Sequence, residues 1–343
     1  MDHETSRRWL IAERPIGRAL SLDDFRMSTA PLPPVGDGQV KLRTLYLGFD
    51  PALKSWMENI AGYAEPTEIG GLMPGMGLGQ VVESASPAFA PGDLALGLIG
   101  WQDIAVVDAG RLEPVPAGVP PTAALGVLGL TGRTAYFGLL EIGRPRPGDT
   151  LVVSGAAGAV GSVVGQIGKI AGCRVIGIAG GAEKCRWLTE ELGFDAAVDY
   201  KAEKPRRRLR DLCPDGIDIL FDNVGGEVLN DCLGRLAFGA RVVICGGIAR
   251  YNADPRDPDG MPAGPRNYFN VVFTQATIQG FLVHHFKDRY PVADRRLAEW
   301  LRRGDIRQGE DILHGFENAP LALMRLFEGA NRGKQLLEIG APA

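Results

Sequence analysis

The sequence predicts an α/β protein in which a Rossmann-type, doubly wound parallel sheet follows a β-rich N-terminal domain. Three observations predict this fold. A strand, a glycine turn, a helix and a second strand follow one another between Asp149 and Trp187. Strand-like and helical runs then alternate to about Val283, as expected of a parallel sheet. Residues 1 to about 125 instead hold short β-like runs separated by prolines, which is typical of a compact barrel or sandwich.

The glycine turn is a candidate binding site for a dinucleotide. Residues 151–154 form a short apolar run, and Gly155, Gly158 and Gly161 follow at three-residue spacing before the helical stretch 159–170. Glycines let the backbone approach a pyrophosphate, and the helix N-terminus presents unpaired N–H groups to it. The alternative is a turn that serves only helix–sheet packing. The complete βαβ unit favours dinucleotide binding.

The remaining elements follow from the same periodicity. Further strands of the parallel sheet are predicted at 174–178, 196–199, 217–222, 240–245 and 277–282, with helices such as 184–192 and 228–236 between them. Earlier strands are predicted at 39–47, 79–83, 94–99 and 104–107. A connecting helix covers 122–142 with a break near 129–132, and helices 292–303 and 320–329 precede a last strand at 335–339. We place the first domain at residues 1–128, with 287–343 returning to it, and the dinucleotide-binding domain at 129–286.

Composition and charge exclude several classes of function. The 343 residues are 45% hydrophobic with a net charge of −4, so no basic surface for nucleic acid or an anionic membrane is expected. No apolar run reaches the roughly 20 residues that span a bilayer. The charged N-terminus lacks the apolar region of a signal peptide. The five cysteines are scattered, and we expect free thiols in a cytoplasmic protein.

The end of the second strand favours NADP(H) over NAD(H). An NAD site usually places Asp or Glu there, roughly 20 residues past the glycines, to bind the ribose 2′-hydroxyl. Here positions 179–181 read Ala-Gly-Gly, which holds no carboxylate to repel a 2′-phosphate. Lys184 lies just beyond, and Tyr200 ends the following strand, so an ammonium group is available for the phosphate. Glu183 could point either way, and a solvated Lys184 remains the alternative.

Metal-dependent and nucleophilic chemistry lack residues at the required spacing. Before Cys173 the only His or Cys is His3, so the first domain carries no zinc ligand set and we expect no metal. His284 and His285 are predicted at a strand end, where neighbouring side chains face opposite ways. No nucleophile elbow and no Gly-Lys-Ser/Thr phosphate loop occur. Hydride transfer remains, in which the cofactor carries the reaction and the protein orients the substrate.

Several motifs together make the chain similar to a known family. In order they are GAAGAVG, AGGAEKC, FDNVGGE, CGGIARY and GANRGKQL, following the β-rich N-terminal domain. The chain resembles the zinc-independent medium-chain dehydrogenase/reductase superfamily, and within it the leukotriene B4 dehydrogenase/prostaglandin reductase family of NADPH-dependent alkenal/one oxidoreductases. The resemblance covers nearly the whole chain. It implies a GroES-like β-barrel for the first domain, and a homodimer.

The resemblance also implies the reaction and the residues of the site. Hydride would go to the β-carbon of a C=C bond conjugated to a carbonyl, in a small enone or enal. Tyr251 is the catalytic candidate, as the hydrogen-bond donor to the carbonyl oxygen. A cofactor ribose hydroxyl as the donor, and Tyr251 as a packing aromatic, remain open. The residues implied at the cofactor are Thr131, Gly158, Ala159, Val160, Gly161, Gly181, Lys184, Tyr200, Asn223, Cys245, Gly246, Gly247, Ile248, Tyr251, Phe281, Leu282, Val283 and Asn331.

The first domain departs from the family pattern. Residues 50–57 read DPALKSWM, with Lys54 where the family has Arg. The residues expected to meet the substrate therefore differ more than those expected to meet the cofactor. The proline-rich loop 252–269 is predicted either as a substrate lid or as a surface loop. Two other functions remain open: an NADPH-dependent quinone reductase, and a non-catalytic NADPH-binding protein.

Overall fold

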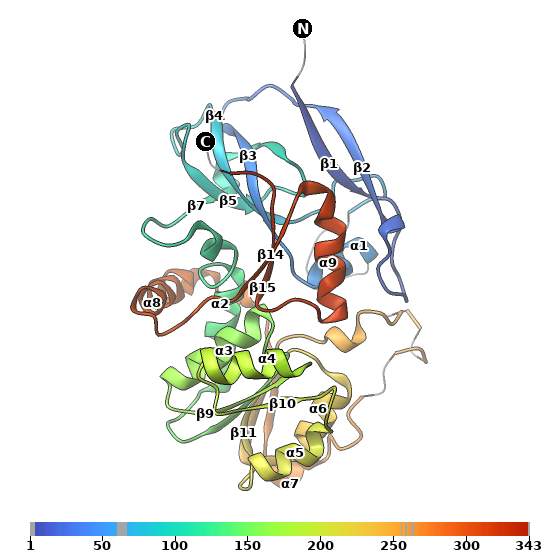
Figure 1. The fold of residues 1–343 in the computed structure, drawn as a ribbon, viewed down its shortest axis with the longest axis vertical. Helices are drawn as coiled ribbons and strands as arrows, with labels where there is room; N and C mark the ends of the chain where they lie inside the picture. The colour runs from blue at the N-terminus through green and yellow to red at the C-terminus, as the bar shows by residue number, and fades with distance from the viewer. Residues whose placement is uncertain (1–3, 60–66, 255, 258, 262–263, 342–343) are drawn as a thin grey trace. The chain divides into compact units, whose positions relative to one another are not determined.

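The chain divides into two compact units (Figure 1). A computed structural model describes residues 4–59, 67–254, 256–257, 259–261 and 264–341. The first unit is Met1–Gly126 with Glu310–Ala343, and the second is Val127–Gly309. No helix among the described residues is long and apolar enough to cross a bilayer.

Residues 287–309, predicted to return to the first domain, lie in the second unit instead. Helix α8 (Tyr290–Arg303) packs on α2 (Leu130–Phe137), where the Arg133 guanidinium donates to both oxygens of Asp294 at 2.8 and 3.0 Å. The return begins only at β14 (Glu310–His314). An amphipathic pattern reveals an apolar helix face but not which domain that face covers.

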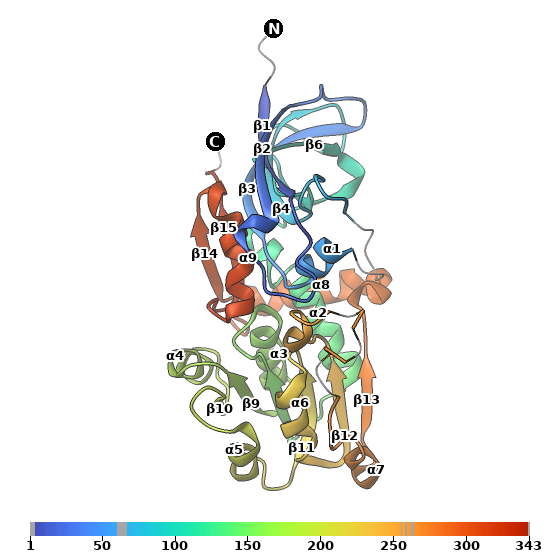
Figure 2. The same cartoon turned by 90° about the vertical axis from the view of Figure 1, so that its right-hand side faces the viewer.

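In the part of the chain that the structure describes, the second unit is built on six parallel strands. Their order is β10-β9-β8-β11-β12-β13, which in chain order is 3-2-1-4-5-6 (Figure 2). This confirms the predicted Rossmann-type sheet, whose ligands bind at the point where strand order reverses, here between β8 and β11. The strands are β8 (Thr150–Ser154), β9 (Arg174–Ala179), β10 (Ala196–Asp199), β11 (Ile217–Asp222), β12 (Leu236–Ile244) and β13 (Thr277–Gly280).

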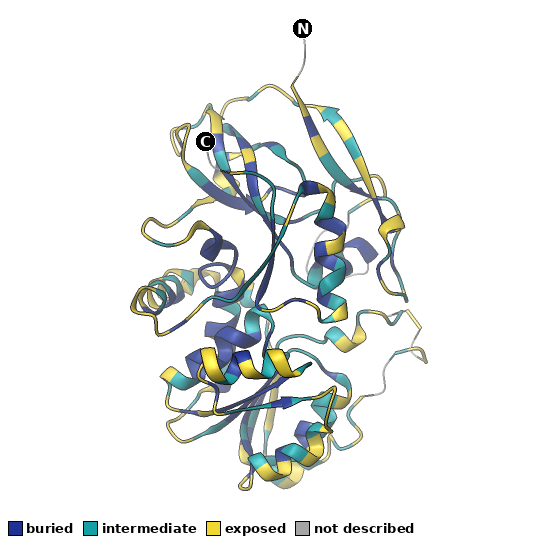
Figure 3. Ribbon diagram, in the orientation of Figure 1, coloured by how far each residue is buried: buried dark blue, intermediate teal, exposed yellow. Residues whose placement is uncertain are grey.

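Helices cover both faces of this sheet. Helix α3 (Ala159–Ile170) lies so close to one face that a Cβ on Gly168 would meet Leu151 Cδ2 at 2.4 Å, and Figure 3 shows most of α3 as buried. Helices α5 (Pro205–Leu212) and α6 (Gly226–Leu233) cover the other face through a cluster that includes Val152, Ile176, Leu209, Leu220, Leu233 and Val242. The short helices α4 (Ala182–Arg186) and α7 (Asn270–Thr274) complete the unit.

Some element boundaries differ from those predicted. The stretch 122–142 divides into a 3₁₀ helix (Pro121–Leu125), α2 and a π-helix (Gly138–Gly143). At Gly138 a Cβ would lie 2.5 Å from the Phe281 ring, so tertiary packing determines this helix path. Strand β12 begins at Leu236, where the sequence predicts the end of a helix. Local composition does not register such long-range contacts.

Among its described residues, the first unit contains an antiparallel sheet in which β14 and β15 pair in parallel. Its seven strands follow the order β14-β15-β3-β4-β5-β7, with β6 paired to β3, and a separate hairpin joins β1 to β2. Around the buried Trp101, the rings of Phe25 and Phe49 lie 5.6 and 5.1 Å away between centroids. The elements are β1 (Thr5–Ile11), β2 (Phe25–Pro31), β3 (Gln39–Gly48), α1 (Ala52–Glu58), β4 (Met76–Ser84), β5 (Leu94–Leu98), β6 (Ile104–Asp108), β7 (Leu112–Pro114), α9 (Ala319–Glu328) and β15 (Lys334–Glu338).

Candidate functional site

The glycine turn after β8 leaves an open helix N-terminus. Gly155 has a φ of +58°, and its carbonyl accepts the N–H of Gly158 at 3.0 Å. Gly158 is the N-cap of α3, and no side chain caps the helix there. At Gly161 a Cβ would lie 2.4 Å from the Gly155 oxygen, so only glycine lets α3 start this close to the turn. The arrangement fits a pyrophosphate bound by the first-turn N–H groups, which include those of Ala159 and Val160.

The ends of β9 and β10 meet beside Gly181. Gly181 has a φ of +100°, and Asp199 Oδ1 accepts its N–H at 2.8 Å and that of Lys201 at 3.0 Å. The side chains of Tyr200 and Lys201 lie against Gly180, where a Cβ would meet them at 2.9 and 3.0 Å. Tyr200 is 46% exposed. Asp199 is not among the residues predicted from the sequence, although the predicted strand 196–199 ends on this carboxylate.

A buried polar network lies where the strand order reverses. The Ser154 hydroxyl donates to Asp222 Oδ1 at 2.5 Å and accepts the N–H of Asn223 at 2.9 Å. The Asn223 Nδ2 donates to the Ser154 carbonyl at 2.8 Å. Asp222 is 1% exposed, and burial raises the pKa of its carboxyl despite the hydrogen bonds that it accepts. Asn223 was predicted at this strand end, whereas Ser154 and Asp222, the polar last residues of two predicted strands, were not predicted as site residues.

The segment after β12 is hydrogen-bonded to the same network. The Asp222 carbonyl accepts the N–H groups of Cys245 at 2.9 Å and Gly246 at 3.1 Å, and Ile248 N–H bonds the Asn223 carbonyl at 3.4 Å. Tyr251 follows one turn later, with its N–H on the Ile248 carbonyl at 3.3 Å. The structure therefore brings Asn223 and the segment that carries Tyr251 to one edge of the sheet.

The Cys245 thiol does not suit nucleophilic chemistry. Burial raises its pKa to about 12, with a smaller contribution from the negative charge of Asp222. At neutral pH it is therefore almost entirely protonated.

The other predicted residues lie in three places. Thr131 is buried in α2, and Phe281 packs on Gly138 with its ring 6.5 Å from that of Phe221. The neighbouring Leu282 is exposed, and Val283 begins a 3₁₀ helix. Asn331 belongs to the first unit, where its Nδ2 donates to the Gly333 carbonyl at 2.9 Å.

In the first unit, the segment that departs from the family pattern is held by two lysines. Lys54 is fully buried, donating to the Pro15 carbonyl at 3.1 Å and pairing with Glu58. Lys334 donates to the Phe49 carbonyl at 3.1 Å and to Asp50 Oδ1 at 2.7 Å. Both ammonium groups therefore hold the backbone around α1. Residues 60–66, just beyond α1, lie outside the described residues.

The loop 252–269 ends against α6. Residues 255, 258 and 262–263 lie outside the described residues. The end of the loop is bonded to α6: Arg266 N–H donates to Asn230 Oδ1 at 3.0 Å, and Asn267 Nδ2 to the Asn230 carbonyl at 2.7 Å. These contacts attach the end of the loop to α6. Its role as a substrate lid or a surface loop stays a prediction.

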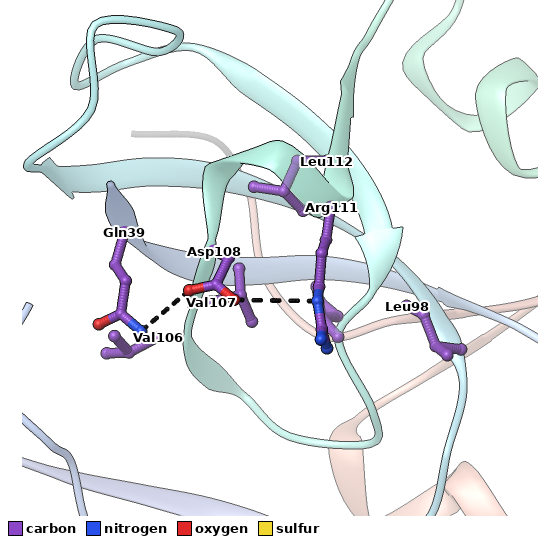
Figure 4. Close-up of a pocket in the computed structure, with 8 residues that line it drawn as sticks. Gln39, Leu98, Val106, Val107, Asp108, Arg111 and Leu112 are labelled. Atoms are coloured by element: carbon purple, nitrogen blue, oxygen red, sulfur yellow. Dashed lines mark hydrogen bonds and ion pairs between the residues drawn. The ribbon is translucent and has the colours of Figure 1, made fainter. Parts of the chain in front are cut away.

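A small pocket of about 180 Å³ lies on the first unit (Figure 4). Asp108 in its wall accepts from Gln39 Nε2 at 3.2 Å and lies 3.8 Å from Arg111 Nε. None of the predicted cofactor residues lines it.

The histidine prediction was wrong in one respect. His284 and His285 lie in a 3₁₀ helix (Val283–Arg289) rather than on a strand, and their rings are 4.4 Å apart between centroids. Among the residues that the structure describes, no three His, Cys, Asp or Glu side chains gather as metal ligands.

Known proteins similar to this chain identify its family. Residues 7–115 match a family model described as the N-terminal domain of oxidoreductase, and residues 159–299 match one described as zinc-binding dehydrogenase. The NADPH-dependent curcumin reductase of Escherichia coli (strain K12) is 41% identical over 342 residues, covering 98% of this chain and 97% of the relative. Prostaglandin reductase 1 of Bos taurus is 37% identical over 340 residues, covering 97% and 99%. The chain belongs to the prostaglandin reductase-like family of zinc-independent medium-chain dehydrogenases/reductases.

A solved structure of this family has the same fold. CurA from Vibrio vulnificus, crystallised in complex with NADPH, is 40% identical with a TM-score of 0.91, covering 98% of this chain and 100% of CurA. The predicted family, and the α/β fold with a parallel sheet, are thereby confirmed.

Proposed function

We propose that this protein is an NADPH-dependent oxidoreductase that reduces the C=C bond of α,β-unsaturated ketones and aldehydes. The observation that carries the proposal is the convergence, at one edge of the parallel sheet, of an uncapped glycine turn, the Asn223 network and the Tyr251 segment. That edge is where parallel α/β sheets bind nucleotides. The E. coli relative, named an NADPH-dependent curcumin reductase, supports the cofactor and the reaction class.

The cofactor would lie along the carboxyl ends of the strands. Gly158 to Gly161 would hold the pyrophosphate, and Gly181, Lys184 and Tyr200 the 2′-phosphate. The ribose–nicotinamide half would meet residues of the second unit: Asn223, Cys245 to Ile248, Phe281 to Val283 and Thr131. When bound, NADPH supplies the hydride that adds to the substrate's β-carbon, and a proton from solvent adds to the α-carbon to complete the reduction.

Tyr251 would polarise the substrate. As hydride arrives, negative charge develops on the carbonyl oxygen, and a hydroxyl that donates to this oxygen lowers the barrier. Tyr251→Phe keeps the ring but removes the donor. We expect kcat/KM to fall about a hundredfold, with a much smaller change in the Kd for NADPH because the ring is kept. A variant with the parental kcat/KM would exclude Tyr251 as the donor.

The function is tested by an NADPH-oxidation screen with product analysis. Enones and enals should give saturated carbonyl products, whereas C=O reduction would give allylic alcohols. Turnover with quinones alone would favour the quinone reductase. Tight NADPH binding without turnover of any enone, aldehyde or quinone would favour the non-catalytic protein.

We further propose a homodimer joined along β13, in the cytoplasm. Strand β13 ends the sheet in the described part of the chain, and all four of its residues are exposed. Beside it, Phe273 on α7 is 73% exposed. An unpaired strand edge with apolar side chains suits pairing with a second copy across a two-fold axis. The five free cysteines suit a reducing compartment.

A further inference from the structure

Asp222 is a buried carboxylate that the proposed reaction does not use. It lies at the carboxyl end of β11, is 1% exposed and forms no ion pair with any described residue. Burying a carboxylate without a cation costs free energy unless hydrogen bonds replace its water. Its oxygens accept Ser154 Oγ–H at 2.5 Å, Gly225 N–H at 2.9 Å and Val224 N–H at 3.3 Å.

These bonds fix the orientation of Asn223. Because the Ser154 hydroxyl gives its proton to Asp222, its oxygen is left to accept the N–H of Asn223 at 2.9 Å. The side-chain Nδ2 of Asn223 donates to the Ser154 carbonyl at 2.8 Å. Asn223 is thus held at two atoms, and its Oδ1 is turned away from the Ser154 carbonyl as an acceptor.

Asp222 also joins the loops that surround Asn223. Its Oδ2 holds Gly225, whose φ of +74° starts the turn into α6. Its carbonyl accepts the N–H groups of Cys245 and Gly246 after β12. One residue therefore connects β8, the turn after β11 and the segment after β12 at the point where strand order reverses.

We propose that Asp222 is a positioning residue: through Ser154 it orients Asn223 so that the Asn223 Oδ1 accepts a hydrogen bond from the ribose–nicotinamide half of bound NADPH. This role rests on the proposed function. It concerns that half of the cofactor alone, since the residues proposed for the 2′-phosphate follow β9 and β10. The network is satisfied internally, so it is formed before the ligand arrives.

The same strand offers a matched control. Asp218 lies near the opposite end of β11, and its Oδ2 accepts the N–H of Thr150 on β8 at 2.8 Å. Asp218 and Asp222 therefore both join β11 to β8. Only Asp222 reaches the edge where the cofactor would bind.

The test compares Asp222→Asn with Asp218→Asn by titration with NADPH and with 2′,5′-ADP, which carries only the 2′-phosphate half. In Asp222→Asn an NH₂ group replaces one acceptor oxygen and faces the donor of Ser154 or Gly225. We expect its Kd for NADPH to rise about tenfold and its Kd for 2′,5′-ADP to change less than about twofold. For Asp218→Asn, both Kd values should stay within about twofold.

Ser154→Ala provides a second test if Asp222→Asn folds poorly. Ser154→Ala should raise the Kd for NADPH more than the Kd for 2′,5′-ADP. Adding Asp222→Asn to it should change the Kd for NADPH little further, because both substitutions act through Asn223. An equal rise in the Kd values for NADPH and 2′,5′-ADP, or an unchanged Kd for NADPH, would overturn the positioning role. If the wild-type protein failed to bind NADPH, the proposed function would fail as well, so the two failures are distinguishable.

Discussion

At the scale of single residues, Lys184 is expected to decide the choice of cofactor. Removing the ammonium in Lys184→Ala takes away a charge-assisted bond to the 2′-phosphate but nothing that NADH needs. The Kd for NADPH should rise about tenfold while that for NADH stays constant. Fluorescence titration measures both constants, with Lys204→Ala on the nearby α5 cap as the control. Equal weakening of the two cofactors would show that Lys184 does not read the phosphate.

Lys54 is expected to stabilise the fold rather than meet a substrate. In Lys54→Met the carboxylate of Glu58, which is 6% exposed, loses the buried ammonium beside it. Removing one partner of a buried ion pair destabilises by about 3–5 kcal/mol, whereas replacing both with apolar groups costs little. We expect a large fall in melting temperature for Lys54→Met and substantial recovery in Lys54→Met with Glu58→Leu. Calorimetry tests this, and a double variant that melts no higher than the single one would contradict it.

Lys54 and Asp222 show which properties of a side chain the sequence does not predict. The departure from the family pattern at Lys54 suggested a residue facing substrate, yet the side chain is fully buried against Pro15 and Glu58. Asp222 is adjacent to the predicted Asn223 but is not among the site residues predicted from the sequence. Neither burial nor hydrogen-bond partner follows from residue type, because both depend on segments distant in the chain.

At the scale of elements, α3 begins so close to the Gly155 turn that only glycine is expected to be tolerated at position 161. In Gly161→Ala the new methyl group would lie 2.4 Å from the Gly155 oxygen and 2.8 Å from the Ala156 Cα, which are backbone atoms that cannot rotate away. The helix must shift, so we expect a lower melting temperature and at least tenfold weaker NADPH binding. Gly110→Ala is the control, because nothing lies within 4 Å of the added methyl group. Unchanged binding by Gly161→Ala would separate this turn from the cofactor site.

The hydrogen bonds through which Asp195 connects α3 to β9 are expected to contribute less stability in acid. Lys169 Nζ donates to both carboxylate oxygens of Asp195 at 2.8 Å, and the Val175 N–H donates to Asp195 Oδ2 at 2.6 Å. Burial alone would raise the pKa of its carboxyl, but these hydrogen bonds outweigh burial and lower it. A lowered folded-state pKa stabilises the fold above the unfolded value of about 3.9, and this contribution is lost as the pH falls through the folded value.

Asp195→Asn tests that contribution. Because the side chain is 35% exposed, we expect the variant to lose only about 0.2–1 kcal/mol at pH 7. The difference from wild type should shrink as the pH falls below about 4. Melting curves across this range measure it, with the exposed Asp37→Asn as the control. A difference that grows in acid would have the wrong sign for this mechanism.

At the scale of the whole molecule, the exposed edge of β13 is expected to hold two copies together. Ile278 is 43% exposed on this edge. Ile278→Lys would place two ammonium groups near each other across a two-fold axis, so we expect the variant to sediment as a monomer while wild type sediments as a dimer. Leu22→Lys, at a 62% exposed position in the first unit, is the control. A wild-type monomer at micromolar concentration would exclude the proposed dimer.

The sequence by itself determined the βαβ units, the glycine turn and the strand ends that carry Gly181 and Asn223. These features depend on local periodicity and on spacing along one strand or helix, which the order of residues records directly. The family motifs added the reaction class and the cofactor. Predicted strands 196–199 and 217–222 coincide with β10 and β11, and the predicted helix 159–170 coincides with α3.

Only the tertiary structure decided which side chains meet. It buried Lys54, placed residues 287–309 in the second unit and joined Ser154 to Asp222 across 68 positions of sequence. The glycine turn suggested a dinucleotide, but the network beside it depends on β8 and β11 being neighbours. That pairing follows from the crossovers of the sheet, which bring distant strand ends together, and no local pattern in the chain encodes the resulting hydrogen bonds.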